Sequence, residues 1–122
     1  MTPLYRQLLG KKGEEYAADY LQNHGYHIIE RNFKINPGEL DIIAVIDDIL
    51  VFVEVKTRVG REFGLPEESV TPKKLREIIK TSQYYAIIRK GLPIRHRIDV
   101  IGIEYTHSGE VVYFNHIQNA SS

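Results

Sequence analysis

Apolar and polar residues along this chain follow first a helical and then a strand-like spacing. Residues 11–24 place apolar side chains on one side of a predicted helix and polar ones on the other, and Gly25 supplies its C-terminal stop. Three strand-like runs follow, at residues 26–33, 40–46 and 49–57. Asp47 and Asp48 separate the last two runs, so we expect these runs to form a β-hairpin.

The second half of the chain repeats this change of spacing. Residues 58–70 contain two glycines, a proline and many charges, which indicates a loop. Thr71 is then a predicted N-cap and Pro72 the first position of a helix that runs to about residue 89. Two closing strands are predicted around a Ser108–Gly109 turn, at residues 95–105 and 110–117. Residues 119–122 are expected to form a frayed tail.

The order helix, three strands, helix, two strands predicts one mixed α/β domain over residues 1–122, with its core at about 10–117. Formal net charge is zero, from 16 basic and 16 acidic residues, so binding of nucleic acid would need local patches. No cysteine is present, which excludes disulfides and thiolate metal sites. The N-terminus has no apolar run typical of a signal peptide, and the longest apolar run, residues 49–53, is too short to span a bilayer. We therefore expect a cytoplasmic protein without membrane contact.

The expected hairpin brings charged residues together on one face. With Asp47 and Asp48 in the turn, facing residues have numbers that sum to 95. Asp41 then faces Glu54, and Glu39 faces Lys56. Side chains alternate across a strand, so all four lie on the same face. Directly opposed residues have Cβ atoms about 4.5–5.5 Å apart, and like charges there destabilise the sheet.

Two opposed carboxylates in an apolar strand pair suggest a bound cation. Magnesium or manganese is the expected ion, because hard cations prefer carboxylate oxygen, water and phosphate as ligands. Asp41 and Glu54 are the candidate ligands, together with the backbone carbonyl of Val55. Lys56 could hold a metal-bound water and stabilise charge on a phosphate, as metal-assisted phosphodiester hydrolysis requires.

The alternative is an ordinary surface. A Glu-x-Lys sequence is common by chance, and Glu39 with Lys56 could form a simple cross-strand ion pair on a wet face. The neighbouring sequence favours the metal site. Residues 49–53 are apolar on both faces, which is typical of a central strand covered on both sides.

These motifs resemble the YraN-like family of uncharacterised bacterial proteins. Residues 38–41 read Gly-Glu-Leu-Asp and residues 51–58 read Val-Phe-Val-Glu-Val-Lys-Thr-Arg. The resemblance extends from residue 10 to about residue 105. Further matching positions are Gly13, Glu14, Ala17, Leu21, Gly25, Tyr26, Asn32, Phe33, Phe63, Gly64, Val70, Lys74, Arg97 and Asp99.

That family is similar to Holliday-junction resolvases and to restriction-endonuclease-like nucleases with a P-D…(D/E)-x-K motif. The resemblance implies their αβββαβ core and a mixed central sheet flanked by helices. It makes Asp41 the metal-binding aspartate, Glu54 the second acid and Lys56 the catalytic lysine. Glu14 would complete the metal site from the first helix. The chain departs from the broad motif at residues 38–39, where Gly-Glu replaces the proline before the aspartate, as is normal within the YraN-like pattern.

The sequence also gives Glu14 some independent support. Glu14, Ala17 and Leu21 have the i, i+3, i+7 spacing that places them on one inward side of the helix. The alternative is an acid that only interacts with the dipole at the helix N-terminus.

Basic residues could surround this acidic site and hold phosphates. The candidates for nucleic-acid binding are Arg58, Arg61, Lys73, Arg76 and Lys80. A further basic cluster lies in residues 89–97. A solvated helix face would explain the lysines and arginine of the second helix equally well. Three other residues are noted without a firm role. Phe63 is interpreted as a fold-back anchor of its loop, with a base-contacting wedge as the alternative. Asp99 is interpreted as a buried acid paired with arginine, and Gln83 as a surface residue or a cleft residue.

Three functions follow from these residues. The leading hypothesis is a magnesium- or manganese-dependent endonuclease that acts on branched or structured DNA in repair or recombination, with a homodimer as one candidate assembly. The second is a nucleic-acid-binding module of the same fold that does not cut. The third is a structural or protein-interaction domain in which the acids and lysine form ion pairs.

Overall fold

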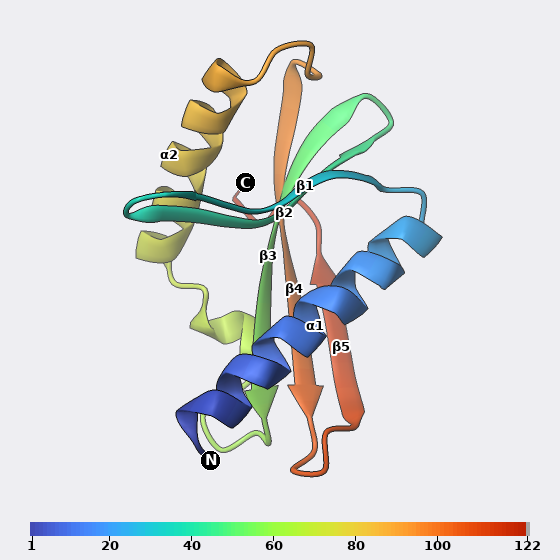
Figure 1. Cartoon of the computed structure of the whole chain (residues 1–122), viewed down its shortest axis with the longest axis vertical. Coiled ribbons are helices and arrows are strands. Elements are labelled where there is room, and N and C mark those ends of the chain that lie inside the picture. Colours follow the sequence, from blue (N-terminus) through green and yellow to red (C-terminus); the bar gives the residue numbers. More distant parts are fainter. Residues whose placement is uncertain (122) are drawn as a thin grey trace.

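A computed structural model describes residues 1–121 and shows one mixed five-stranded sheet with a long helix on each face (Figure 1). The strands lie in sequence order, and only β3 and β4 run parallel. The elements are α1 Pro3–Asn23, β1 His27–Ile35, β2 Gly38–Ile46, β3 Ile49–Val59, the short 3-10 helix η1 Pro66–Ser69, α2 Pro72–Ile88, β4 Arg95–Tyr105 and β5 Val111–Ile117. The α/β class, the element order and the sheet flanked by helices are as expected.

Strand β3 lies at the centre of two apolar layers. Its odd-numbered residues, such as Val51 and Val53, pack with α1 and with the inner side chains of β4. Its even-numbered residues Leu50 and Phe52 pack with α2 on the opposite face, around Tyr85. This explains the apolar run at residues 49–53, because a strand covered on both faces has no wet side.

Helix α1 begins eight residues earlier than the apolar spacing indicates. Thr2 is its N-cap, whose hydroxyl accepts a hydrogen bond from the Tyr5 N–H at 3.1 Å, and Pro3 follows in the first turn. Thr71 and Pro72 start α2 in the same way, with a 3.2 Å bond from the Lys74 N–H. The Thr-Pro pair therefore marks both helix starts.

Three expectations about loops and termini are wrong in part. The segment 58–70 is not a loop throughout, because β3 extends to Val59 and η1 follows. Phe63 does not anchor this segment, since 77% of its side chain is exposed. The C-terminal tail is held rather than frayed. The Asn119 N–H donates to Asp99 and the Ala120 N–H donates to the Ile98 carbonyl. Ser122 lies outside the described residues.

The β2–β3 hairpin has the expected register over five pairs, from Ile46–Ile49 to Ile42–Val53, and all their numbers sum to 95. Asp47 and Asp48 form the turn with φ values of 47° and 60°, a left-handed conformation that aspartate tolerates better than most residues. Beyond Ile42 the ladder ends. Strand β2 instead continues with β1 as a two-stranded arm that leaves the sheet and runs toward α2 (Figure 1).

Gly13 is the point of closest approach between α1 and the sheet. A Cβ atom there would lie 2.2 Å from Thr57 Cγ2, whereas one at Gly10 would have no neighbour within 4 Å. We expect Gly13→Ala to lower the free energy of unfolding by about 1–2 kcal/mol, because overpacking outweighs the gain in helix propensity. Urea unfolding measures the effect.

Gly10→Ala is the matched control, and it is expected to stabilise the protein by up to about 1 kcal/mol. Thr57→Ser removes the clashing methyl group and should restore most of the stability that Gly13→Ala loses. Equal stabilisation by both alanine substitutions would contradict the close contact.

Candidate metal and catalytic site

The site forms where β2 separates from β3. There the Val55 N–H has no strand partner on the β2 side and instead donates to the Asp41 carboxylate, with N–Oδ2 at 2.9 Å. Asp41 is only 6% exposed. A buried N–H requires an acceptor, so this bond fixes the Asp41 side chain against β3.

Glu54 lies beside Asp41 and is also buried, with 5% of the residue exposed. Burial and then the charge and hydrogen bonding of Glu54 raise the pKa of Asp41 to about 8, against the opposing effect of the Val55 N–H. Two carboxyl groups this close cannot both ionise cheaply, and they therefore share a proton or bind a cation.

Two lysines from different elements flank the Glu54 carboxylate. Lys56 Nζ lies 3.4 Å from Glu54 Oε2, and Lys74 Nζ lies 3.8 Å from the same oxygen. Lys74 was not among the predicted site residues. Its spacing of four residues before the buried Ile78 is the signal that could have found it, because i and i+4 share a helix face.

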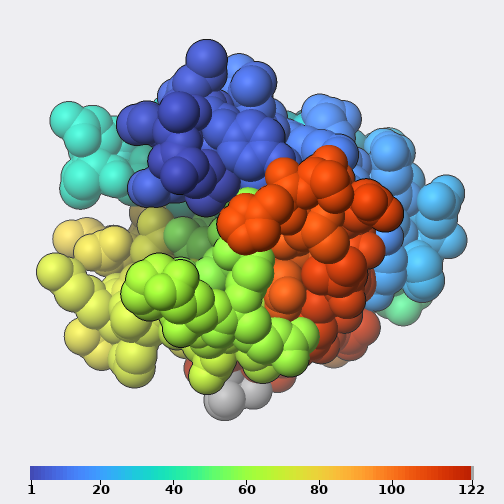
Figure 2. Space-filling model, turned by 90° about the horizontal axis from the view of Figure 1, so that it is seen from below, coloured from blue at the N-terminus to red at the C-terminus, as the bar shows by residue number. Residues whose placement is uncertain are grey.

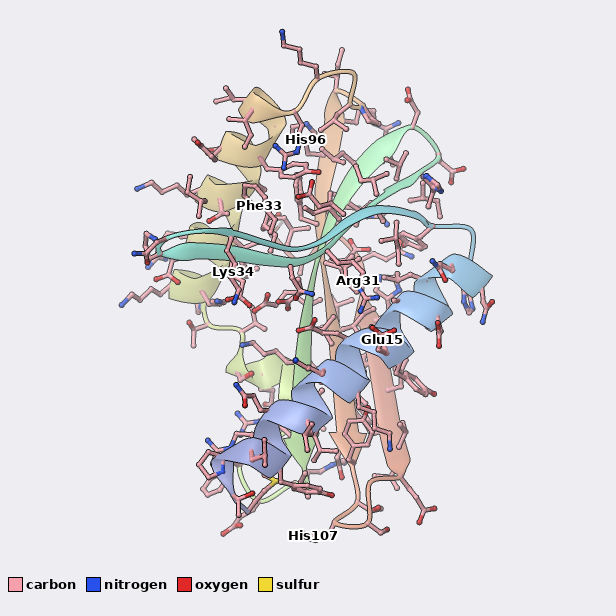
Figure 3. The ribbon with its side chains drawn as sticks, viewed as in Figure 1. Glu15, Arg31, Phe33, Lys34, His96 and His107 are labelled. Carbon is pink, nitrogen blue, oxygen red and sulfur yellow. The ribbon has the colours of Figure 1, made fainter. Side chains whose placement is uncertain are left out.

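Glu14 lies half-buried on α1 at the edge of this cluster. Burial raises its pKa, Arg31 opposes the shift, and the charges of Glu39 and Glu54 add to it. Arg31 reaches from β1 to α1, where it forms a 2.7 Å ion pair with Glu15 (Figure 3). The Glu14 carboxylate is therefore close enough to Glu54 for their charges to interact. Its role as a metal ligand stays a prediction.

Glu39 does not face Lys56 as the extended register implied. The β2–β3 ladder ends at Ile42–Val53, and Glu39 instead pairs with Lys34 in the β1–β2 arm. Asp41 and Glu54 lie one position beyond the last pair of the ladder, and the bond from the Val55 N–H holds Asp41 there.

The donor set fits a hard divalent cation. Within residues 1–121, no three acidic or histidine side chains are grouped closely enough to hold a metal ion by themselves. Asp41 and Glu54 would thus provide two carboxylates, with the Val55 carbonyl as a possible third oxygen. Magnesium commonly binds through one or two carboxylates and takes its other ligands from water and substrate phosphate.

An open groove lies between α1 and the arm, with Glu14 in its lining. Its volume is about 560 Å³, and its lining includes both acidic and basic side chains: Lys11, Glu14, Arg31, Lys34 and Glu39. Figure 2 shows the molecule hollowed between the first residues of α1 in dark blue, the arm in cyan and the start of α2 in yellow. Lys34 lies on the arm beside this opening (Figure 3).

The predicted nucleic-acid-binding residues do not form one surface. Lys73, Arg76 and Lys80 lie exposed along α2. Arg58 is half-buried, and its Nε has no hydrogen-bond partner in residues 1–121. Arg61 forms a 2.9 Å ion pair with Glu104, which reduces the charge that it can offer to a phosphate.

Two arginines of the other basic cluster, in residues 89–97, are paired with acids of the protein. Arg89 binds Glu30 at 3.1 Å, and Arg97 binds the fully buried Asp99 at 2.9 Å. Burial opposes ionisation of Asp99, but bonds from His116 and Arg97 outweigh it and lower its pKa. Asp99 is thus the arginine-paired acid that the sequence indicated, and it joins β4 to the C-terminal segment. Gln83 is exposed on α2 and makes no hydrogen bond within the described chain.

The fold and this site define an α/β protein with two buried acids and two lysines gathered beside the middle of the central strand, where β2 separates from β3. Residues 13–103 match the UPF0102 family, which is described as an uncharacterised protein family. The chain belongs to this family, which confirms the YraN-like resemblance.

Similar proteins share this family over nearly their whole length. A UPF0102 protein of Desulforamulus reducens is 44% identical over 119 residues, 96% of this chain and 98% of the relative. A relative in Geobacter metallireducens is 43% identical over 117 residues, 96% of this chain and 94% of the relative. One in Clostridium perfringens is 40% identical over 116 residues, 95% of each chain. Their names state no activity. No helix within residues 1–121 is long and apolar enough to cross a membrane.

Proposed function

We propose that this protein is a metal-dependent endonuclease that hydrolyses phosphodiester bonds in branched or structured DNA. The observation that carries the proposal is the buried pair Asp41 and Glu54 with Lys56 Nζ 3.4 Å from the Glu54 carboxylate. Burying two acids side by side is costly unless cations compensate them, and a divalent ion would add to the two lysine charges that flank Glu54.

Magnesium or manganese held there would polarise a phosphate oxygen and lower the pKa of a bound water. The Val55 N–H fixes Asp41, and Glu54 holds the Lys56 ammonium beside both acids. Lys56 can then orient the attacking water and stabilise the charge that develops on the phosphate. Lys74 adds a second positive charge from α2 on the same carboxylate.

The surroundings of the site suit a phosphate backbone. The groove between α1 and the arm is open and carries Lys11 and Lys34 among side chains of both charges. Lys73, Arg76 and Lys80 lie exposed on α2. Contacts of this kind bind phosphates without reading sequence. They support a substrate recognised by its shape, in agreement with the similarity to junction resolvases.

Cleavage of defined DNA structures tests the proposal. Purified protein with magnesium or manganese is incubated with a duplex, a flap, a four-way junction and a single strand. We expect cleavage of at least one structured DNA, and loss of that cleavage on Asp41→Ala because the metal site is removed. Asp19→Ala replaces an exposed aspartate on α1 and should leave activity unchanged.

Activity that survives Asp41→Ala would identify a contaminating nuclease. Absence of cleavage on every DNA with either metal would refute the nuclease.

A second function is a DNA-binding module of the same fold that does not cut. The observation in its favour is that residues 1–121 contain no preformed group of three metal-ligating side chains. Calorimetry separates the two functions. DNA binding without measurable magnesium or manganese binding would favour the module. Unchanged metal and DNA affinity in an Asp41→Asn, Glu54→Gln double variant would instead indicate that the acids have only a structural role.

A further inference from the structure

A second hollow lies on the α2 side of the arm. Its volume is about 330 Å³, and its walls come from the turn of the arm and the middle of α2: Ile35, Asn36, Pro37, Gly38, Glu77, Lys80, Thr81 and Tyr84. Figure 1 shows this turn of the arm beside α2. The walls are mainly apolar, with a few polar groups at the rim, as is usual for sites that take a small planar ligand.

Tyr84 and Ile35 keep apolar surface open at this hollow. Tyr84 is 42% exposed, and its side chain makes no hydrogen bond or ring contact within residues 1–121. The next residue, Tyr85, is 2% exposed, and its hydroxyl donates to Glu30 at 2.8 Å. The two tyrosines therefore differ in their environment. Tyr85 belongs to the core, whereas the Tyr84 ring is free to stack on a ligand.

The hollow continues toward the acids. Gly38, Glu77 and Thr81 also line a small neighbouring cavity whose other walls include Lys74. Lys74 Nζ lies 3.8 Å from the Glu54 carboxylate. Lys74 thus connects the surroundings of the hollow with the Glu54 carboxylate.

The position of the hollow relative to the acids is fixed by close packing. A Cβ atom at Gly38 would lie 2.2 Å from Thr81 Oγ1, so the arm backbone rests directly on α2. The Thr81 hydroxyl donates to the Glu77 carbonyl at 2.9 Å, which holds that side chain in place. A site placed so firmly can select the shape of what enters it.

Charge around the hollow suits one strand of a nucleic acid. Lys80 lies in its wall, and Lys73 and Arg76 lie exposed on the same helix. Basic residues beside an exposed aromatic ring are typical of single-strand binding, where the backbone meets the charges and a base stacks on the ring. The Asn36 amide, which makes no hydrogen bond in the described chain, can meet the polar edge of a base.

We propose that this hollow receives one unpaired nucleobase of the DNA strand whose phosphate lies at Asp41 and Glu54. The inference rests on the proposed nuclease function and narrows its substrate to DNA with an unpaired nucleotide next to the cleaved bond. Continuous duplex cannot supply such a base without unstacking it, which costs a few kcal/mol. Stacking on Tyr84 favours flaps, bulges and open branch points over plain duplex.

Binding measured without metal tests the proposal apart from cleavage. Fluorescence anisotropy in a chelator compares three DNAs: a flap, the same flap with an abasic site at the junction nucleotide, and a duplex. We expect Tyr84→Ala to weaken flap binding about tenfold and to leave abasic flap and duplex binding unchanged, because only the intact flap offers a base to stack. Tyr84→Phe should keep full affinity. Tyr16→Ala, at a tyrosine that is 44% exposed on α1, is the matched control.

The outcomes separate this inference from the proposed function. Equal loss on all three DNAs, or no loss on any, would overturn the base pocket even if the protein cuts DNA. A Tyr84-dependent preference for the intact flap in a protein that never cuts would support the pocket and refute the nuclease. Self-association in sedimentation that Tyr84→Ala abolishes would assign the hollow to a second copy of the chain, and would also overturn the proposal.

Discussion

Replacing Lys56 with alanine is expected to lower the rate of metal-dependent DNA cleavage at least about a hundredfold. Its ammonium is the nearest positive charge to the Glu54 carboxylate, at 3.4 Å, and no other element places a cation closer in residues 1–121. Loss of a charge that acts on the attacking water and the phosphate affects the chemical step. Single-turnover cleavage at saturating protein measures that step directly.

The fold should survive this change. Lys56 is one-third exposed, and Lys74 remains 3.8 Å from the Glu54 carboxylate, so this buried acid keeps a positive partner. Urea unfolding therefore verifies that lost cleavage is not lost structure. Lys90→Ala, at an exposed lysine after α2, is the matched control. Cleavage within a few-fold of the wild-type rate in Lys56→Ala would remove the lysine from the mechanism.

The second large effect concerns stability and pH. In the metal-free protein, Asp41 has a pKa of about 8 in the folded state and an ordinary value of 3.8 when unfolded. Between these values the folded state binds more protons, so stability falls as pH rises from about 4 to about 8. Asparagine cannot ionise and avoids this loss. We expect the free energy of unfolding of Asp41→Asn to exceed that of wild type by on the order of 2–5 kcal/mol above pH 8. Below pH 4 we expect little difference.

Urea unfolding in a chelator at the two ends of this pH range measures the effect. Asp19→Asn, at an exposed aspartate, should follow wild type throughout. Magnesium should then stabilise wild type at high pH and leave Asp41→Asn nearly unchanged, because binding to the folded state alone raises stability. If the difference in the free energy of unfolding between wild type and Asp41→Asn does not change with pH, the pKa of Asp41 is not raised in the folded state.

Local rules of sequence were enough to predict the sheet around the site. The apolar run at residues 49–53 indicated the central strand, and the Asp47–Asp48 turn gave the register of five strand pairs. They did not indicate where that ladder ends. Strand β2 has one edge toward β1 and the other toward β3. Which of the two strands it follows beyond Ile42 depends on its packing with α2, and the spacing of apolar residues in the sequence does not show that packing.

The dependence on long-range packing also explains which side chains of the candidate site could be predicted from the sequence. Asp41, Glu54 and Lys56 lie close in sequence on neighbouring strands, so hairpin arithmetic could bring them together. Lys74 comes from a distant helix and joins them only through tertiary packing. The ion pairs of Arg61 and Arg89 are long-range in the same sense, and sequence gave no reason to remove their charges from the expected basic surface.

The contact between Gly38 and Thr81 has a consequence for the acids. The arm leaves the sheet at Ile42 and rests on α2 at Gly38, so Asp41 lies on a span supported at both ends. A side chain added at residue 38 would collide with Thr81 and push the arm away from α2. The position of Asp41 therefore depends on close packing at a residue that carries no charge.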